Sequence, residues 1–363
     1  MLRAAATTRP ARGGPSDQYD TEHTVTQPKY VSDFQRSPLR SPISPYEASA
    51  PLATARTESF QQAADALLRR LRRRDALRPG SLIVTVFGDA IAPRGGNVAL
   101  AGLIRAGALF GINERHVRTS VGRLAQDGWI EAQRIGRVSF YRLSGGGRRR
   151  FAEATQRIYG ESPGEWDGHW TLVALPPGAT SERERVREEM TLLGFGQLQP
   201  GLFASPTRTP QDTLATLREL GVAGDVLVTR ATTFGAHADE RMARTAWDLD
   251  ELGRRYRDFV SLFEPLEQAA TGERSIPVDA AFVVRTLLIH EYRKIHLRDP
   301  LLPSSLLPAD FVGRRAGELC RSLYARLFQA AEKYLSVSMH TAEGALPAPN
   351  AEAYRRFGGL RAH

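Results

Sequence analysis

Apolar residues recur every three or four positions in three segments near the start of the chain, which is the spacing of a buried helix face. The first segment begins at Ser59 and ends in a run of arginines. The other two are Val98–Leu109 and Glu114–Gln126, and Gly111 lies in the short turn between them. Asn113 precedes the last segment, where its side chain can cap a helix. The pattern therefore predicts a helix–turn–helix unit preceded by one more helix.

Shorter apolar runs on both sides of this unit favour strands by their composition. Trp129–Gln133 and Arg137–Leu143 flank Gly136 and predict a β-hairpin. Ser81–Ala92 is also rich in β-branched residues, and propensity alone favours a strand there. The residues that follow that run, Pro-Arg-Gly-Gly, end it. Helix, turn, helix and hairpin, in this order, are the parts of a winged helix-turn-helix.

The middle of the chain alternates short apolar runs with helical segments. We expect a strand, a helix, a strand, a helix and a strand in turn, at Trp170–Leu175, Glu182–Leu193, Gly196–Ser205, Thr213–Leu220 and Asp225–Thr229. This order suggests a small α+β sandwich of ferredoxin-like type. From Asp239 the pattern is helical, over residues 239–268, 276–296 and 311–336. After Met339 proline and alanine become frequent, and we expect the chain to fray.

The sequence therefore predicts an α+β protein with a winged helix-turn-helix, a central ferredoxin-like α/β sandwich and a helical C-terminal domain. Residues 1–57 contain few large apolar side chains, which predicts a disordered tail. The three glycines at 145–147 are expected to form a hinge. The expected boundaries are 58–145 for the winged helix-turn-helix, 146–164 for a linker helix, 165–238 for the sandwich, 239–338 for the helical domain and 339–363 for a flexible tail.

The positive charge of the chain is concentrated in one segment. The whole chain has a formal charge of +9, yet residues 59–160 alone contain 18 arginines against 7 carboxylates, a net charge of +11. A basic segment joined to a mildly acidic remainder fits a module that binds nucleic-acid phosphates. The alternative is an arginine-rich surface that is simply solvated.

The predicted helix Glu114–Gln126 has two distinct faces. Val117, Val121 and Leu124 fall at positions i, i+4 and i+7 and form one buried stripe. The N-terminal half of the second helix enters the major groove in helix-turn-helix proteins. Arginine can pair with guanine there, and threonine can contact a base. The candidate DNA-binding residues of this helix are therefore Arg115, Arg118, Thr119 and Arg123.

The predicted hairpin adds two more cations. Arg134 and Arg137 flank its Gly136 tip, where a wing meets phosphates or the minor groove. The competing interpretation is a helical hairpin followed by a β-hairpin, with arginines on a solvated face.

Cysteine and hydropathy limit the remaining possibilities. Cys320 is the only cysteine, so no internal disulfide and no cysteine-based zinc site can form. It lies in an apolar helical pattern, which favours a core position over a nucleophile. No run of about 18 apolar residues and no secretory signal are present, so we expect a cytoplasmic protein without a membrane-spanning helix.

One motif superficially resembles a zinc site but has the wrong spacing. His290 and Glu291 are followed by His296, six positions after the first histidine. Zinc-binding histidines on one helix are four positions apart. A spacing of six turns the second side chain about 240° around the helix, so the pair does not converge. We therefore expect no metal site there and no cofactor.

Several strings in the chain resemble the PaaX-type transcriptional regulators, the repressors of phenylacetic acid catabolism. The resemblance covers about residues 75–336, and its most specific part is the string at 285–308. The matching strings are SLIVTVFGDAIAPRGG at 81–96, GINERHVRTSVGRLAQDGWI at 111–130, GRVSFYRL at 136–143, RIY at 157–159, AWDL at 246–249 with Tyr256, Phe259 and Phe263, and RTLLIHEYRKIHLRDPLLPSSLLP at 285–308.

The resemblance implies a homodimeric repressor that binds double-stranded DNA at a pseudo-palindromic operator. It implies that Ser81–Ala92 is the first helix of the winged-helix domain, and that the sandwich is a dimerisation domain akin to CRISPR-associated small nucleases. It also implies an aryl-acetyl-coenzyme A effector, such as phenylacetyl-CoA, that releases the repressor from DNA.

The polar residues around 290–299 have two interpretations. They could form a network that pins the C-terminal domain, with Asp299 as a member. Alternatively, some of them line the effector site, because guanidinium groups pair well with the phosphates of an acyl-CoA. The candidate effector-binding residues are His290, Arg293, His296 and Arg298.

Two other function classes remain open. A metal-dependent nuclease would need several carboxylates at strand ends in the sandwich, and only Asp167 and Asp225 stand near such ends. The nuclease is therefore the weaker alternative, and we expect no catalytic residues. A DNA-architectural protein would bind DNA without responding to an effector.

Overall fold

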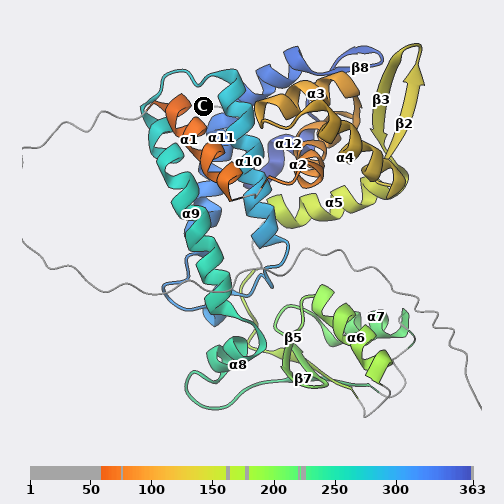
Figure 1. Cartoon of the computed structure of the whole chain (residues 1–363). Coiled ribbons are helices and arrows are strands. Elements are labelled where there is room, and N and C mark those ends of the chain that lie inside the picture. Colours follow the sequence, from red (N-terminus) through yellow and green to blue (C-terminus); the bar gives the residue numbers. More distant parts are fainter. Residues whose placement is uncertain are drawn as a thin grey trace, which may run out of the picture. The chain divides into compact units, whose positions relative to one another are not determined.

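The computed structural model describes residues 59–74, 77–160, 164–175, 180–219, 221 and 226–360, which combine helices with small antiparallel sheets (Figure 1). This mixture confirms the α+β class. The tail predicted at residues 1–57 lies outside the described residues. None of the described helices is long and apolar enough to cross a membrane.

The first two helices lie close to the long helices of the C-terminal part. Helix α1 (Phe60–Arg73) begins with a capping box in which the Ser59 hydroxyl accepts from the Gln62 amide. Helix α2 (Pro79–Val86) continues as a π-helical turn η1 (Phe87–Ile91) and a 3-10 turn η2 (Ala92–Arg94). The segment favoured as a strand by propensity is thus helical. It is apolar on nearly every side because it is buried among other helices.

Two helices and a β-hairpin are present in the segment where the sequence predicted them. After the short strand β1 (Asn97–Ala99) come helices α3 (Leu100–Leu109) and α4 (Glu114–Gln126). The hairpin follows as β2 (Ile130–Ile135) and β3 (Val138–Leu143), and the sheet order is β1-β3-β2. Strand β1 was not predicted. It pairs with β3, whose residues lie more than 40 positions further along the chain. The local apolar spacing indicated only a helix there and contained no sign of this distant pairing.

The three glycines at 145–147, where the sequence predicted a hinge, lie within a helix. They form the first turn of helix α5 (Gly145–Tyr159), and the Ser144 hydroxyl caps this turn by accepting from the Gly147 amide at 2.8 Å. A side chain at Gly147 would collide with the carbonyl oxygen of Trp129. Glycine is needed at position 147 for this close backbone approach.

The middle of the chain forms a four-stranded antiparallel sheet, in which the strands lie in the order Gly196–Gln199, Leu202–Ser205, Trp170–Ala174 and Leu227–Ala231. The strands and helices alternate in the order strand, helix, strand, strand, helix, strand, which is typical of a ferredoxin-like unit. The Asp225 end of the strand predicted at 225–229 lies outside the described residues. The elements are β4 (Trp170–Ala174), α6 (Thr180–Leu192), β5 (Gly196–Gln199), β6 (Leu202–Ser205), α7 (Pro210–Glu219) and β7 (Leu227–Ala231).

Long helices follow this sheet. The helix expected at 239–268 is two helices, because Trp247 is extended and Asp248 starts a new helix by capping the Glu251 amide. The Trp247 ring stacks on that of Trp170 in β4. The elements are α8 (Ala238–Ala246), α9 (Leu249–Gly272), α10 (Val278–His296), η3 (Ser304–Leu306) and α11 (Gly313–Ser338).

Regular structure continues after Met339, where the sequence predicted a flexible tail at 339–363, and residues 361–363 lie outside the described part of the chain. Residues 340–358 form strands β8 (His340–Thr341) and β9 (Gly344–Ala345), helix α12 (Ala351–Arg355) and the turn η4 (Arg356–Gly358). Arg356 and Phe357 are buried. These two side chains anchor the segment, and neither belongs to a periodic apolar pattern.

Candidate nucleic-acid interface

One face of α4 is fixed in the core. Val117 and Val121 have no exposed surface, and Leu124 is also buried. The Asn113 side chain accepts a 2.9 Å hydrogen bond from the His116 amide, which confirms the predicted N-cap. Core packing and cap together determine which side of α4 faces solvent.

The opposite face carries the predicted DNA-binding residues. Arg115, Arg118, Thr119 and Arg123 are all exposed. The Arg118 guanidinium donates to the Glu114 carboxylate from Nε at 2.8 Å, and both side chains are 56% exposed. Such an exposed i,i+4 pair is worth only about 0.3–0.5 kcal/mol. This pair therefore holds Arg118 over the N-terminal half of the helix. Little free energy is lost when the guanidinium leaves Glu114 for a stronger hydrogen-bond acceptor.

Thr119 presents a restricted set of groups to solvent. Its hydroxyl donates to the Arg115 carbonyl at 2.9 Å. With that proton engaged, the oxygen can still accept a hydrogen bond and the methyl group can still make an apolar contact. Acceptance from a base amino group and contact with a thymine methyl are the two interactions that this geometry allows.

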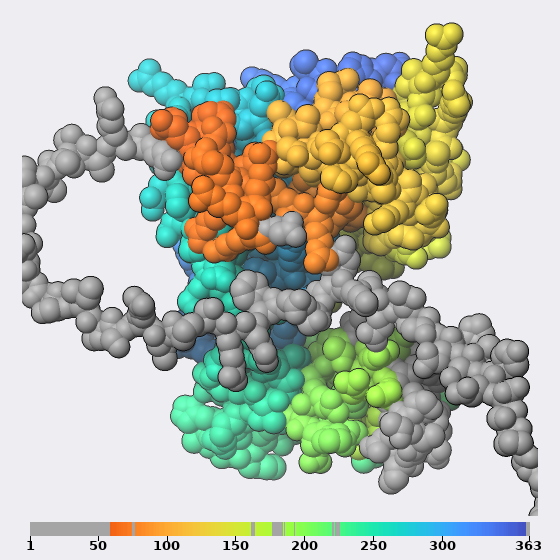
Figure 2. Space-filling view, in the orientation of Figure 1, coloured from red at the N-terminus to blue at the C-terminus, as the bar shows by residue number. Residues whose placement is uncertain are grey.

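The β2–β3 hairpin extends beyond the helices and ends in a basic tip (Figures 1 and 2). Gly136 forms the turn with a φ of 60°, a value that glycine adopts readily. Arg134 donates to the Gly136 carbonyl at 3.2 Å, and Arg137 is exposed. Ile135 and Val138 are also about half exposed. The tip therefore combines two cations with two apolar side chains.

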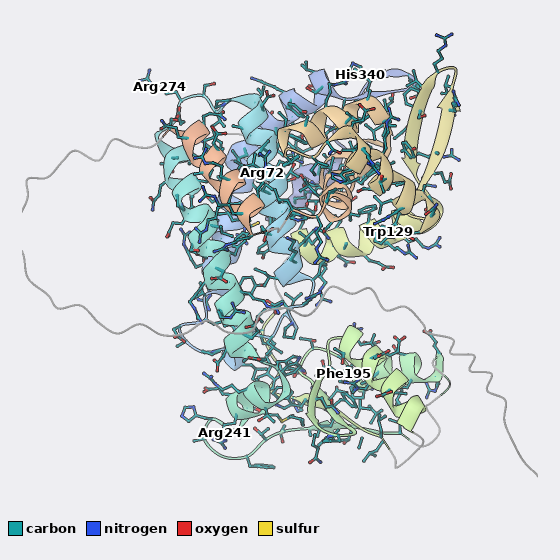
Figure 3. All side chains as sticks on the ribbon, in the orientation of Figure 1. Arg72, Trp129, Phe195, Arg241, Arg274 and His340 are labelled. Carbon is teal, nitrogen blue, oxygen red and sulfur yellow. The ribbon has the colours of Figure 1, made fainter. Side chains whose placement is uncertain are left out.

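Helix α1 braces the turn between α3 and α4. Arg72, labelled in Figure 3, donates to the Phe110 carbonyl at 3.1 Å. A side chain at Gly111, whose φ is 71°, would run into the Arg72 guanidinium. The basic end of α1 is thus partly used to hold the helix–turn–helix in place.

A buried polar cluster behind the interface was not predicted. Asp89, in η1, is only 3% exposed and accepts hydrogen bonds from four side chains. Its carboxylate accepts hydrogen bonds from the hydroxyls of Tyr159 and Tyr324 at 2.8 Å each. It also accepts from the guanidinium groups of Arg285 and Arg356 at 2.9 Å each. These donors come from α5, α11, α10 and η4, so one carboxylate joins the end of α2 to four later elements.

The charges of this cluster compensate one another. Burial raises the pKa of Asp89, but the Arg285 and Arg356 guanidinium groups lower it by more than burial raises it. The pKa of Asp89 is therefore below its ordinary value. Arg285 also donates to Glu332 at 2.7 Å, and Glu332 pairs with buried Arg94. The sequence signal for this cluster was a charged residue within each of two apolar runs, Asp89 in one and Arg285 in the other, because buried charges need partners.

A second set of contacts joins α2 to α10. Arg293 donates from Nε to the Thr85 hydroxyl and from a terminal nitrogen to the Ser81 hydroxyl, at 2.9 and 2.8 Å. The Nδ1 atom of fully buried His290 lies 2.9 Å from the same Thr85 oxygen. The α3–α4 unit is thus connected to the C-terminal helices through α2.

The four predicted effector-binding residues do not converge on one site. His290 and Arg293 bond α10 to α2, as described. His296 lies 3.1 Å from the Tyr256 hydroxyl, which donates to the Asp299 carboxylate at 2.6 Å. Arg298 is exposed and, within the described residues, takes no part in these contacts. The polar residues at 290–299 thus form two separate sets of contacts instead of the one network expected there.

Two hollows lie beside these contacts. A partly open cavity of about 100 Å³ lies between α2, α5 and α10. A larger cleft of about 830 Å³ is lined by His296, Asp299, the residues that follow them and the start of α11. Arg293 reaches the first hollow and His296 the second.

The α+β sheet gives the nuclease alternative no support. The Asp167 carboxylate receives the Arg230 guanidinium at 2.6 Å and accepts from the His169 amide. These contacts lower its pKa. In the part of the chain that the structure describes, no three His, Cys, Asp or Glu side chains gather as a metal site would require, and Asp225 lies outside that part.

Comparisons with known proteins agree on one family. The family models described as PaaX-like protein, PaaX protein central Cas2-like domain and PaaX-like protein C-terminal domain match residues 78–147, 163–243 and 247–337. The transcriptional repressor PaaX of Escherichia coli K12 is 37% identical over 287 residues, which cover 77% of this chain and 90% of that protein.

Among solved structures, an uncharacterized protein from Mycobacterium tuberculosis shares 24% identity over 63% of this chain and 89% of its own. Its TM-score of 0.43 is too low to indicate a common overall arrangement.

Proposed function

The chain belongs to the PaaX family, and from this premise we propose that it is a DNA-binding transcriptional repressor. The observation that carries the proposal is the exposed face of α4. A helix whose opposite face is fixed in the core presents Arg115, Arg118 and Thr119 together on its N-terminal half. In a winged helix-turn-helix this half lies in the major groove.

The candidate residues divide by the part of DNA that they would contact. Arg118, Arg115 and Thr119 would contact base edges and determine which sequence is bound. Arg123, further along α4, would contact the phosphate backbone. Arg134 and Arg137, at the hairpin tip, would contact phosphates or the minor groove and add affinity with little dependence on sequence.

The proposed repressor acts as a cytoplasmic homodimer. The ferredoxin-like sheet would be the dimerisation domain, and two copies of α4 would read the two halves of a pseudo-palindromic operator. The effector would be an aryl-acetyl-CoA thioester such as phenylacetyl-CoA. It releases DNA only if it binds more tightly to the arrangement that does not fit the operator.

The test of DNA binding uses the full chain and two DNA duplexes of equal length. One duplex carries the region upstream of the gene that encodes the protein, and the other has a shuffled sequence. Fluorescence anisotropy at about 0.15 M salt should show binding to the upstream duplex at least 1,000-fold tighter than to the shuffled one. Equal affinity for both would mean that the protein is not a sequence-specific regulator.

A further inference from the structure

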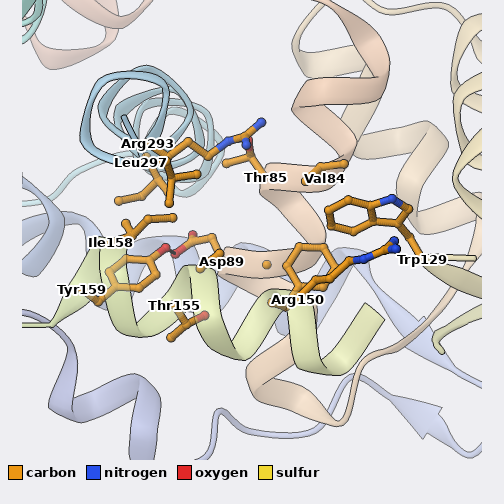
Figure 4. Close-up of a pocket in the computed structure, with 14 residues that line it drawn as sticks. Val84, Thr85, Asp89, Trp129, Arg150, Thr155, Ile158, Tyr159, Arg293 and Leu297 are labelled. Carbon is orange, nitrogen blue, oxygen red and sulfur yellow. Dashed lines mark hydrogen bonds between the residues drawn. The ribbon is translucent and has the colours of Figure 1, made fainter. Parts of the chain in front are cut away.

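The cavity between α2, α5 and α10 is lined by residues that lie far apart in the sequence. Val84, Thr85 and Gly88 come from α2 and η1, and Ile289 and Leu297 from α10 and the residue after it. Helix α5 closes it with side chains that include Arg150, Phe151 and Ala154. Figure 4 shows Trp129 and Arg150 at one end and Ile158, Tyr159 and Leu297 at the other.

The lining suits a flat aromatic group. Most of it is apolar, and the rings of Trp129, Phe151 and Tyr159 contribute to it. Its volume of about 100 Å³ is of the order of an engineered apolar cavity, roughly 150 Å³, that binds benzene. The cavity is partly open, so a group that fills it can carry a longer tail outward.

A cation stands where such a tail would leave. The Arg150 guanidinium lies 5.0 Å from the centre of the Trp129 ring, and Arg150 is exposed. A guanidinium group in this position can bind a phosphate or carboxylate group. The cavity with its mouth therefore fits an aromatic ring joined to an anionic tail.

The position of Trp129 connects this cavity to the DNA-binding elements. Its amide donates to the Leu124 carbonyl near the end of α4 at 2.9 Å, and its carbonyl accepts from Ser144 just after β3 at 3.1 Å. Its ring packs edge-on against Phe151 of α5 at 5.5 Å. One residue thus contacts the cavity with its ring and the junction of α4, the hairpin and α5 with its backbone.

The larger cleft lacks such a connection. Its lining comes from residues 256–321, and none of it belongs to α2, α4 or the hairpin. A ligand there would contact only the C-terminal helices and the loop between α10 and α11. Because an effector must interact differently with the DNA-bound and released arrangements, the smaller cavity is better placed to transmit its binding.

We propose that the cavity between α2, α5 and α10 is the effector site, where an aromatic acyl group inserts against Trp129 and Phe151 and its anionic tail binds Arg150. The inference rests on the proposed function, since it locates the effector of that regulator. Occupation of the cavity displaces the Trp129 ring and thereby moves α4 and the hairpin out of the geometry that fits DNA.

The test compares two alanines of α5 that face different hollows. Ala154 lines the proposed site, whereas Ala152 lines a hollow on the other side of the helix, next to Asn350 and Arg356. Calorimetry on DNA-free full-length protein would measure binding of phenylacetate, phenylacetyl-CoA and CoA to the wild type, Ala154→Leu and Ala152→Leu. Anisotropy would measure release of the upstream duplex by the same three compounds.

We expect phenylacetyl-CoA to bind and release DNA, and Ala154→Leu to weaken both effects at least tenfold. Ala152→Leu should behave as wild type. If phenylacetate binds and CoA does not, the ligand is the aromatic acid with its free carboxylate. This result supports the same cavity as the binding site. Unchanged ligand binding in Ala154→Leu would overturn the cavity assignment and leave the proposed regulator intact.

A second pair of variants guards against misfolding of Ala154→Leu. Arg150→Gln should weaken phenylacetyl-CoA binding by about tenfold, because it removes a charge-assisted contact. Arg149→Gln should not, since Arg149 does not line the cavity. Equal affinities in these two variants would contradict the inference. If the wild type binds DNA specifically but none of the three compounds, the effector proposal and the cavity assignment both fail while DNA binding stands.

Discussion

Arg285 donates a 2.9 Å hydrogen bond to the carboxylate of Asp89, although 196 positions separate the two residues along the chain. Both side chains are almost completely buried. The contact joins helix α10 to the turn that follows α2, directly behind the helix–turn–helix. The orientation of the candidate DNA-binding face thus depends on residues from the far end of the chain.

Removal of the Asp89 charge should destabilise the protein strongly. Asp89→Asn would leave the buried guanidinium groups of Arg285 and Arg356 without their shared carboxylate, and breaking such a pair costs about 3–5 kcal/mol. Urea unfolding should show a loss of this size. Asp250→Asn is the control, since Asp250 is 92% exposed and should change stability by less than about 0.5 kcal/mol. Similar small losses in both variants would show that the cluster does not stabilise the fold.

The glycines before α5 should respond differently to alanine. Gly145 has open space around its Cβ position, so Gly145→Ala should raise the free energy of unfolding by about 0.4–1 kcal/mol. Gly147→Ala should lower it by about 1–3 kcal/mol, because the new methyl group meets the Trp129 carbonyl. Both values come from chemical denaturation. A hinge at these glycines would instead make Gly145→Ala impair DNA binding or its release.

Stability should depend on pH through His296. Burial lowers the pKa of His296 below 6.5 and outweighs the Asp299 carboxylate, which acts in the opposite direction. As the pH falls below 6.5, the unfolded chain takes up this proton before the folded one does, so unfolding becomes more favourable. The contribution is complete above pH 6.5 and decreases toward the lowered pKa of the folded state.

The measurement is urea unfolding of wild type and His296→Gln between pH 7.5 and 5. The wild type should lose stability more steeply over this range than the variant. Parallel curves would mean that His296 titrates alike in the folded and unfolded chains.

Local signals explain why the interface was predicted and the cluster behind it was not. The bounds of α4 and its Asn113 cap follow from residues within a few positions of each other, and the structure reproduces both. The pairing of Asp89 with Arg285 joins two distant helices, and periodicity within either helix contains no information about it. Arg356 was missed for the same reason, since its segment acquires its fold from contacts with Asp89 and Tyr324.

Neutralisation of Glu114 should strengthen DNA binding. Its carboxylate holds Arg118 and adds a negative charge to the face that approaches DNA phosphates. Glu114→Gln should therefore raise affinity for the upstream duplex by roughly two- to fivefold at moderate salt. Asp127→Asn, at the other end of α4, is the matched control and should have a smaller effect. Weaker binding by Glu114→Gln would show that the ion pair positions Arg118 for recognition.

In the proposed regulator the exposed face of α4 reads the DNA sequence, while the hairpin tip binds the backbone. Anisotropy with the upstream and shuffled duplexes tests it in Arg118→Ala and Arg137→Ala. Arg118→Ala should lose about 1–3 kcal/mol on the upstream duplex and much less on the shuffled one. Arg137→Ala should weaken both alike and reduce the salt dependence by about one ion. Equal losses on both duplexes for Arg118→Ala would show that this face of α4 does not read the DNA sequence.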